Sequence, residues 1–130
     1  MSQKPHNKVM HRDEDVRLLD FSFSPNGGAD PATTSFRGAG ITSIVWVSTG
    51  KWTVTLDDTY PVLVRPPSFS IERATPAAKA VDFHVVANTI DTDGKFSFVY
   101  REDHLVADIA ANTNTRIGIS LALRNRTVPT

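Results

Sequence analysis

One strictly alternating stretch limits what this chain can fold into. In KWTVTL, residues 51–56, the apolar side chains of Trp52, Val54 and Leu56 alternate with threonines. A period of two residues is typical of a β-strand with one buried side and one solvent-facing side. A Gly-Lys turn precedes the stretch, and the apolar run ITSIVWV lies before that turn. The sequence therefore predicts a β-hairpin here.

Similar short runs recur along the chain, separated by turn-rich segments such as PNGGADP and ATPAAK. The strands that we expect are residues 18–24, 41–47, 52–56, 68–73, 80–90, 95–102 and 116–125. Residues 57–64 are expected to hold one helical turn before the prolines that follow force an extended path. No long helical period interrupts this pattern. Seven or eight short strands predict an all-β domain, a β-sandwich or jelly roll, over residues 18–130.

Residues 1–17 differ from the rest because only Val9, Met10 and Val16 are apolar. Since so few apolar groups cannot form a core, we expect an extended, flexible N-terminal arm. The segment has no apolar core of a secretion signal, and no run in the chain approaches the roughly 20 residues that span a bilayer. Candidate partner contacts in the arm are its basic residues, Lys4, Lys8, Arg12 and Arg17.

The charge balance and the lack of cysteine exclude several functions. Fourteen basic and fourteen acidic residues cancel, which argues against a dedicated nucleic-acid binder and permits self-association. With no cysteine, the chain has no disulfide, thiolate zinc site or cysteine nucleophile. No serine lies in a Gly-x-Ser-x-Gly motif, and no phosphate-binding loop is present. We expect a protein that binds rather than catalyses, without a cofactor.

The hairpin around the turn DTDG can be assigned a register from its polarity. If Ile90 lies opposite Lys95, apolar and polar side chains separate onto different faces of the hairpin. The side expected to be buried carries Val81, Phe83, Val85, Ala87, Phe96, Phe98 and Tyr100. The side expected to face solvent carries Asp82, His84, Asn88, Ser97, Arg101 and Asp103.

Two acid-x-His pairs, Asp82-x-His84 and Glu102-x-His104, are the candidates for a metal site, because alternate strand residues share a face. In the register above the pairs fall on opposite faces, and only a register slipped by one residue would unite them. We therefore expect no metal site. A cupin-like metalloenzyme remains the alternative if the two histidines converge.

Two tryptophans, Trp46 and Trp52, flank the first turn. Their indoles could stack on a sugar ring or on another partner, or they could pack in the core as strand aromatics commonly do. Both interpretations stay open from the sequence.

Two segments, GITSIVWVSTGKWTVTLDDTYPVLV and NTNTRIGISLALRNRT, resemble small structural proteins of tailed bacteriophages. In those proteins a TGxaTVTLxDxYxxLL segment (a is aromatic) precedes a jelly-roll core, and an Asn-x-Arg-Ile opening leads into the last strand. The similarity covers about residues 36–126, and Pro61 departs from the pattern. The matching residues are Thr49, Gly50, Trp52, Thr53–Leu56, Asp58, Tyr60, Leu63, Asn114, Arg116 and Ile117.

The resemblance implies a virion protein: a capsid decoration (cement) protein, or a receptor- or glycan-binding module of a head or tail fibre. Many such domains resemble the trimeric jelly roll of the tumour-necrosis-factor and C1q type. Since the chain has no heptad or collagen-like repeat for a shaft, a decoration protein is favoured. Its expected partners are the major capsid protein and its own copies, as a dimer or trimer, on the capsid exterior after synthesis in the host cytoplasm.

Overall fold

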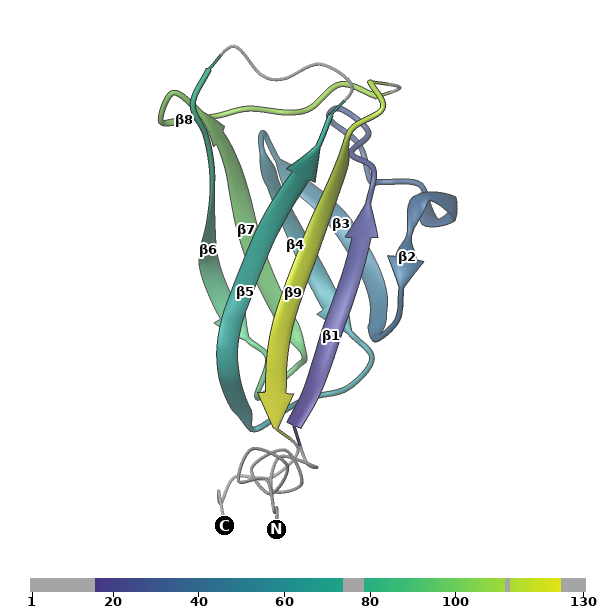
Figure 1. The fold of residues 1–130 in the computed structure, drawn as a ribbon, viewed down its shortest axis with the longest axis vertical. Coiled ribbons are helices and arrows are strands. Elements are labelled where there is room, and N and C mark those ends of the chain that lie inside the picture. The colour runs from purple at the N-terminus through teal and green to yellow at the C-terminus, as the bar shows by residue number, and fades with distance from the viewer. Residues whose placement is uncertain (1–15, 74–78, 112, 125–130) are drawn as a thin grey trace, which may run out of the picture.

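The computed structural model describes residues 16–73, 79–111 and 113–124, and these contain β-strands, turns and no α-helix. Two antiparallel sheets pack face to face, which confirms the predicted β-sandwich (Figure 1). The elements are β1 (Val16–Phe23), the 3-10 turn η1 (Thr33–Ser35), β2 (Arg37–Gly38), β3 (Ile41–Ser48), β4 (Lys51–Leu56), β5 (Val62–Glu72), β6 (Val81–Thr89), β7 (Lys95–Glu102), β8 (Leu105–Val106) and β9 (Arg116–Arg124).

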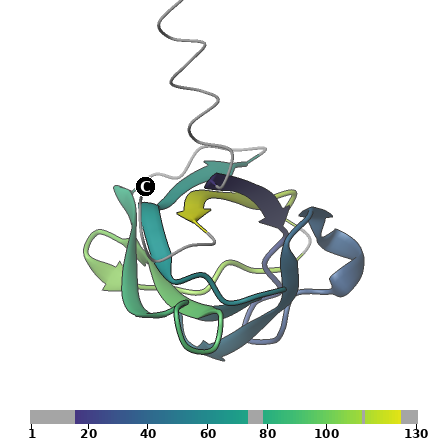
Figure 2. The same cartoon turned by 90° about the horizontal axis from the view of Figure 1, so that it is seen from below.

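The first sheet has the strand order β2-β1-β9-β5, and the second has the order β3-β4-β7-β6 with β8 beside β7. The first and last described strands pair along their whole length, from Val16 opposite Arg124 to Phe23 opposite Ile117. Seen from below, the two sheets curve around a shared interior (Figure 2). We call the end that holds Val16 and Arg124 the N-terminal pole, and the end with β8 the far pole.

The core follows the alternation in the sequence. Trp52, Val54 and Leu56 on β4 are buried, as predicted, and Trp52 has no exposed surface. Its indole stacks on Phe98 of β7 at a centroid distance of 5.5 Å and meets the Phe23 ring of the opposite sheet edge-on at 6.0 Å. These aromatic contacts join the two sheets and stabilise their packing.

The β6–β7 hairpin confirms the predicted faces near its open end but not the predicted pairing. Phe83 lies opposite Tyr100 and Val85 opposite Phe98, whereas Lys95 lies opposite Thr89 rather than Ile90. Phe98 and Tyr100 are fully buried, while Phe83 and Val85 are half-buried because β6 is an edge strand.

A β-bulge between Val85 and Ala87 separates the two parts of this hairpin. Beyond it, Ala87 lies opposite Ser97 and Asn88 opposite Phe96. Ala87 is exposed and Ser97 is buried, both contrary to the prediction, whereas Asn88 is exposed as predicted. Ile90 leaves the strand for the core, where it is 2% exposed and its carbonyl accepts from Tyr60 N at 3.2 Å. Because Ile90 is buried in the core, Thr89 takes its expected place opposite Lys95 in the β6–β7 pairing.

The helical turn expected in residues 57–64 is absent. Tyr60 is buried instead, and β5 begins at Val62. β5 continues through Pro66 and Pro67 with shifts of register against β9. It is an edge strand, where a proline that lacks an N–H is tolerated.

The N-terminal boundary also differs from the expectation. Val16 and Arg17, expected in the arm, belong to β1 and pair with Arg124 and Leu123. The other three candidate contact residues, Lys4, Lys8 and Arg12, lie outside the described residues.

Candidate functional site

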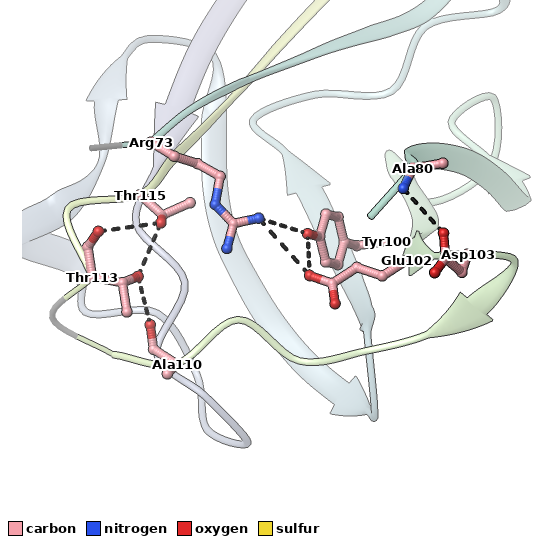
Figure 3. Close-up of polar contacts among 8 residues, drawn as sticks. All are labelled: Arg73, Ala80, Tyr100, Glu102, Asp103, Ala110, Thr113 and Thr115. Atoms are coloured by element: carbon pink, nitrogen blue, oxygen red, sulfur yellow. Dashed lines mark hydrogen bonds and ion pairs between the residues drawn. The ribbon is translucent and has the colours of Figure 1, made fainter. Parts of the chain in front are cut away.

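A polar cluster joins the two sheets at the far pole (Figure 3). Arg73 follows the end of β5 in the first sheet, while Tyr100 and Glu102 lie on β7 in the second. The Tyr100 hydroxyl donates to Glu102 Oε2 at 2.6 Å and accepts from Arg73 Nη1 at 2.9 Å. Arg73 Nη1 also lies 3.8 Å from Glu102 Oε2.

Burial, with the hydrogen bond to Glu102 as the next cause, raises the pKa of Tyr100 to about 12. The phenol therefore keeps its proton at neutral pH and is a hydrogen-bond donor rather than a base or nucleophile. We assign this cluster to stabilising the sandwich.

A shallow polar pocket of about 300 Å³ lies close to the start of β9. Thr113 Oγ1 donates to Ala110 O at 3.0 Å and lies 2.9 Å from Thr115 Oγ1 (Figure 3). Asn114, one of the residues that carry the resemblance, has a positive φ of 54°. The lining has hydroxyls and amides but no ionisable side chain, so the pocket can form hydrogen bonds but offers no acid or base. The lining residues are Ser24, Pro25, Asn26, Ala32, Ser35, Ala111, Thr113, Asn114 and Thr115.

Asp82 and His84 lie on the solvent-facing side of β6 and Glu102 lies on the other side of the sheet, as the sequence predicted, whereas His104 lies in the turn between β7 and β8 and on neither face. On the solvent-facing side, Arg101 Nε donates to Asp82 Oδ1 at 2.9 Å, and Arg101 Nη2 lies 2.5 Å from His84 Nε2. The hydrogen bond from Arg101 is the main cause that lowers the pKa of Asp82. Glu102 instead shares the Tyr100 cluster, and His104 lies in the exposed β7–β8 turn. Within the described ranges, no three His, Cys, Asp or Glu side chains are placed to hold a metal ion.

The two tryptophans have different environments. Trp52 is fully buried, so it offers no surface to a glycan or partner. Trp46 is half-buried and its indole Nε1 donates to Asp108 Oδ1 at 2.9 Å. Its backbone N–H donates to Asp30 Oδ1 at 2.9 Å. Trp46 is therefore fixed against neighbouring loops.

Asp108 is a residue that the sequence reasoning missed. Besides Trp46, its Oδ1 accepts from Gly50 N at 2.7 Å and so holds the β3–β4 turn. Gly50 has a φ of 67°, and its carbonyl accepts from Tyr100 N at 2.8 Å. No motif links Asp108 to a turn nearly sixty residues earlier, so only the fold brings them together.

A larger cleft, of about 500 Å³, opens at the N-terminal pole. It lies between the start of β1, the β2–β3 connection and the segment that follows β4. Arg17, the one described member of the candidate contact set, lines it. The complete lining is Arg17, Leu18, Leu19, Asp20, Ala39, Gly40, Asp57, Asp58 and Tyr60.

Comparison with known proteins yields no relative: no protein-family model, no curated protein and no solved structure matches the chain. Within the part of the chain that the structure describes, no helix is long and apolar enough to cross a membrane. The candidate interaction sites are therefore defined by their geometry alone, and the N-terminal-pole cleft is the largest that we describe.

Proposed function

We propose that this chain is a structural protein of a tailed-bacteriophage virion, an external capsid decoration protein. It binds the outer surface of the shell as a homo-oligomer, a dimer or trimer, and stabilises the shell by contact rather than by catalysis. The major capsid protein is its partner, and the N-terminal arm forms part of the grip. Synthesis takes place in the host cytoplasm.

The positions of the residues that carry the phage resemblance support this proposal. Trp52 and Tyr60 are core residues, and Gly50 forms the buried β3–β4 turn. These residues determine the fold, so the resemblance concerns the framework of the domain. The pairing of β1 with β9 inside the first sheet, opposite a second sheet, supports a jelly-roll classification.

The observation that carries the proposal is the place where the arm joins the folded body. Val16 begins β1 at the N-terminal pole, and Arg17 lines the cleft at that pole. Residues 1–12, with three basic and no acidic residues, are therefore attached at one end of a rigid sandwich. An oligomer would present several such segments to the shell at once, and multivalent contact increases the overall binding strength.

A receptor- or glycan-binding role in a head or tail fibre is the second candidate. The specific observation in its favour is the polar pocket at the far pole, which lies at the opposite end of the sandwich from the start of β1 and is lined by hydroxyl and amide groups. Such groups can bind the hydroxyls of a sugar.

Deletion of residues 2–15 tests the decoration proposal. The deletion stops before β1, so we expect the domain to fold with an almost unchanged melting temperature. We expect its occupancy on purified capsids that lack the protein to fall, and the binding of the full chain to weaken with salt. The deletion removes three basic and three acidic residues and so leaves the net charge unchanged. A second variant, Lys51→Gln with Lys95→Gln, removes two positive charges from the folded body and shows whether net charge alone affects occupancy.

Equally tight binding by the truncated and full chains would contradict the role of the arm. If neither chain binds capsids, and mass spectrometry of virions detects no copies, the decoration proposal itself fails. A glycan that binds the far-pole pocket would then favour the second candidate.

A further inference from the structure

The second sheet carries an apolar patch on the side that points away from the core. We call this side the outer face of the second sheet. Val45, Val47, Val86 and Val106 belong to it and are 41–51% exposed. They are four of the seven large hydrophobic side chains that are exposed in the described part of the chain. Because the solvent side of a sheet normally carries polar residues, such a patch indicates a contact surface.

The strand register defines this face. Val45 of β3 lies opposite Thr53 of β4, Thr53 lies opposite Ser97 of β7, and Ser97 lies opposite Ala87 of β6. Residues directly opposite each other on paired strands point to the same side of a sheet. Trp52, next to Thr53, points into the core, so this row of side chains points outward. The bulges and rows beside it bring further valines to the same face: Val47, Val86, Val99 and Val106.

The polar side chains of the outer face bond to one another. Thr53 Oγ1 lies 2.7 Å from Ser97 Oγ, and Ser97 is only 8% exposed in the middle of the face. Arg101 Nε donates to Asp82 Oδ1 at 2.9 Å. Polar groups that keep such partners can be removed from water at a lower cost than groups that lose their only partner. The face can therefore be covered by a partner that supplies apolar contacts.

The solvent side of the first sheet has a different character. Its exposed large hydrophobic side chains, Leu18 and Val64, both lie near the N-terminal pole. The centre of that side consists of small and polar residues: Asp20, Ser22, Ser68, Ser70, Gly118 and Ser120. Hydroxyl groups are well solvated by water, so this side requires no partner. The difference between the two sides assigns the contact surface to the second sheet.

All four sheet edges carry features that oppose pairing with a further strand. One edge of the first sheet, β2, has only two residues, and the other, β5, contains Pro66 and Pro67. In the second sheet β6 has a bulge, and the Trp46 N–H of β3 already donates to Asp30. Association by strand addition is therefore disfavoured, which leaves a sheet face as the contact surface.

The outer face is complementary to itself about a two-fold axis that runs parallel to the strands between β4 and β7. Such an axis places β3 of one copy over β6 of the other, because the strand order is β3-β4-β7-β6. The exposed Val45 of β3 then meets the exposed Val86 and Ala87 of β6. Each apolar edge of the face therefore covers the other, as in an isologous dimer.

The charges of the face agree with the same axis. Lys51 of β4 forms no ion pair among the described residues. Asp82 of β6 lies in the same half of the sheet, nearer the far pole. The axis directs Lys51 of one copy towards Asp82 of the other, whose carboxylate has acceptor positions beyond its bonds to Arg101. Opposite charges that meet across an interface fix the orientation of the two partners.

The size of the face sets the strength of the contact. Its four strands have six to nine residues each. At the spacings of a β-sheet they span roughly 19 Å by 20–30 Å, or about 400–550 Å² of each copy. Two copies together would bury about 1,000 Å², which is near the lower limit of a specific interface. We therefore expect a dimer that dissociates on dilution rather than a permanent one.

We infer that the outer face of the second sheet is the contact surface between two copies of this chain. The copies pack sheet against sheet, with Val45 of each over Ala87 of the other and side chains interdigitating as in a sandwich core. The inference rests on the proposed function and deepens it, because it names the surface that joins the subunits of the homo-oligomer. The partner of this face is a second copy of this chain, and the unit is a dimer.

Sedimentation velocity of the full chain over a series of concentrations tests the inference. We expect a monomer at low concentration and a dimer at high concentration. Val45→Glu should raise the dissociation constant about tenfold or more, because an ionised side chain replaces an apolar contact. The matched control is Ser70→Glu, which adds the same charge at an exposed position on the first sheet and should leave dimerisation unchanged. Melting curves verify that both variants are folded.

Cross-linking tests the geometry of the dimer. Isotopically labelled and unlabelled chains are mixed at a concentration that favours the dimer and treated with a carbodiimide, which joins a lysine amine to a neighbouring carboxylate. We expect a link between Lys51 and Asp82 that contains one labelled and one unlabelled peptide, detected by mass spectrometry. The Val45→Glu variant should lose this mixed link.

A chain that stays monomeric at every concentration would overturn the inference, and so would equal effects of Val45→Glu and Ser70→Glu. A trimer, or mixed links that do not include Lys51 and Asp82, would exclude the two-fold arrangement. A monomer whose occupancy on capsids falls with Val45→Glu would assign the face to the capsid protein instead. Dimerisation is measured without capsids, so its failure leaves the decoration proposal to the capsid-binding test.

Discussion

Replacing Gly50 with alanine should reveal how tightly the β3–β4 turn packs against the far pole. At φ 67°, Gly50 lies in the left-handed region that disfavours a side chain. An added Cβ would lie 2.8 Å from both Ala107 N and Ala107 O, and 2.9 Å from Tyr100 O. All three are backbone atoms, so the clash cannot be relieved by rotating a side chain.

Gly27 provides a matched control for the conformational part of the effect. Its φ is 62°, but no atom lies within 4 Å of an added Cβ. The left-handed conformation costs alanine about 1–2 kcal/mol, and the reduced freedom of the unfolded chain offsets about 0.4–1 kcal/mol. Gly27→Ala should therefore lower the free energy of unfolding by about 1 kcal/mol.

Gly50→Ala has the same two contributions and adds the steric conflict. Overpacking against atoms that cannot move away costs about 1–3 kcal/mol. We therefore expect a total loss of about 2–4 kcal/mol. For a domain of this size, each 1 kcal/mol shifts the melting temperature by about 3–6 °C, so the two variants should be clearly separated.

Urea unfolding followed by tryptophan fluorescence measures the difference, because Trp52 is fully buried in the core. Equal losses in the two variants would refute the reasoning. They would mean that the turn does not pack against Ala107 and Tyr100 as described.

Two further predictions concern the core and the far-pole cluster. Phe98→Ala should lower the free energy of unfolding by about 3–5 kcal/mol, because Phe98 is fully buried. Phe83→Ala should lower it by only about 2 kcal/mol, because Phe83 is half-buried on an edge strand. A larger loss in Phe83→Ala than in Phe98→Ala, measured by urea unfolding, would contradict the placement of Phe83 on the edge of the core. Tyr100→Phe should cost about 1–2 kcal/mol by removing the hydroxyl between Arg73 and Glu102. Because the pKa of Tyr100 is about 12 in the folded chain against an ordinary value of 10.0, its contribution is fully present below pH 10 and is lost as the pH rises through 12. Urea denaturation between pH 10 and pH 12 should therefore show a smaller loss of stability in Tyr100→Phe than in the unchanged chain. Identical stability profiles of the two proteins against pH would show that ionisation of Tyr100 does not cause the alkaline loss.

Local alternation in the sequence was sufficient to predict the β-class and the buried side of several strands. Trp52, Val54 and Leu56 face the core as their spacing indicates, and Phe98 and Tyr100 do the same on β7. These assignments depend only on the two-residue period of a strand, a property of neighbouring residues. The position of Trp52 beside Phe23 and Phe98 needed the packed sheets.

The pairing of β6 with β7 shows the limit of that reasoning. Moving one strand by two residues leaves every side chain on the same face, so polarity cannot distinguish Phe83 opposite Tyr100 from Phe83 opposite Glu102. The burial of Ile90 and the bulge after Val85 determine the choice, and both depend on contacts with the rest of the fold.

The candidate sites depended still more on tertiary structure. The sequence identified Arg17 as a basic residue of the N-terminal segment, but its place in a cleft with Asp57, Asp58 and Tyr60 follows from the packing of distant loops. The Asp108 contact to Trp46 likewise joins residues 62 positions apart. Sequence alone determined which residues alternate and which segments carry charge, because these properties are local. Only the folded chain decided which of those residues meet, because such contacts depend on how the two sheets pack and where the connecting loops cross them.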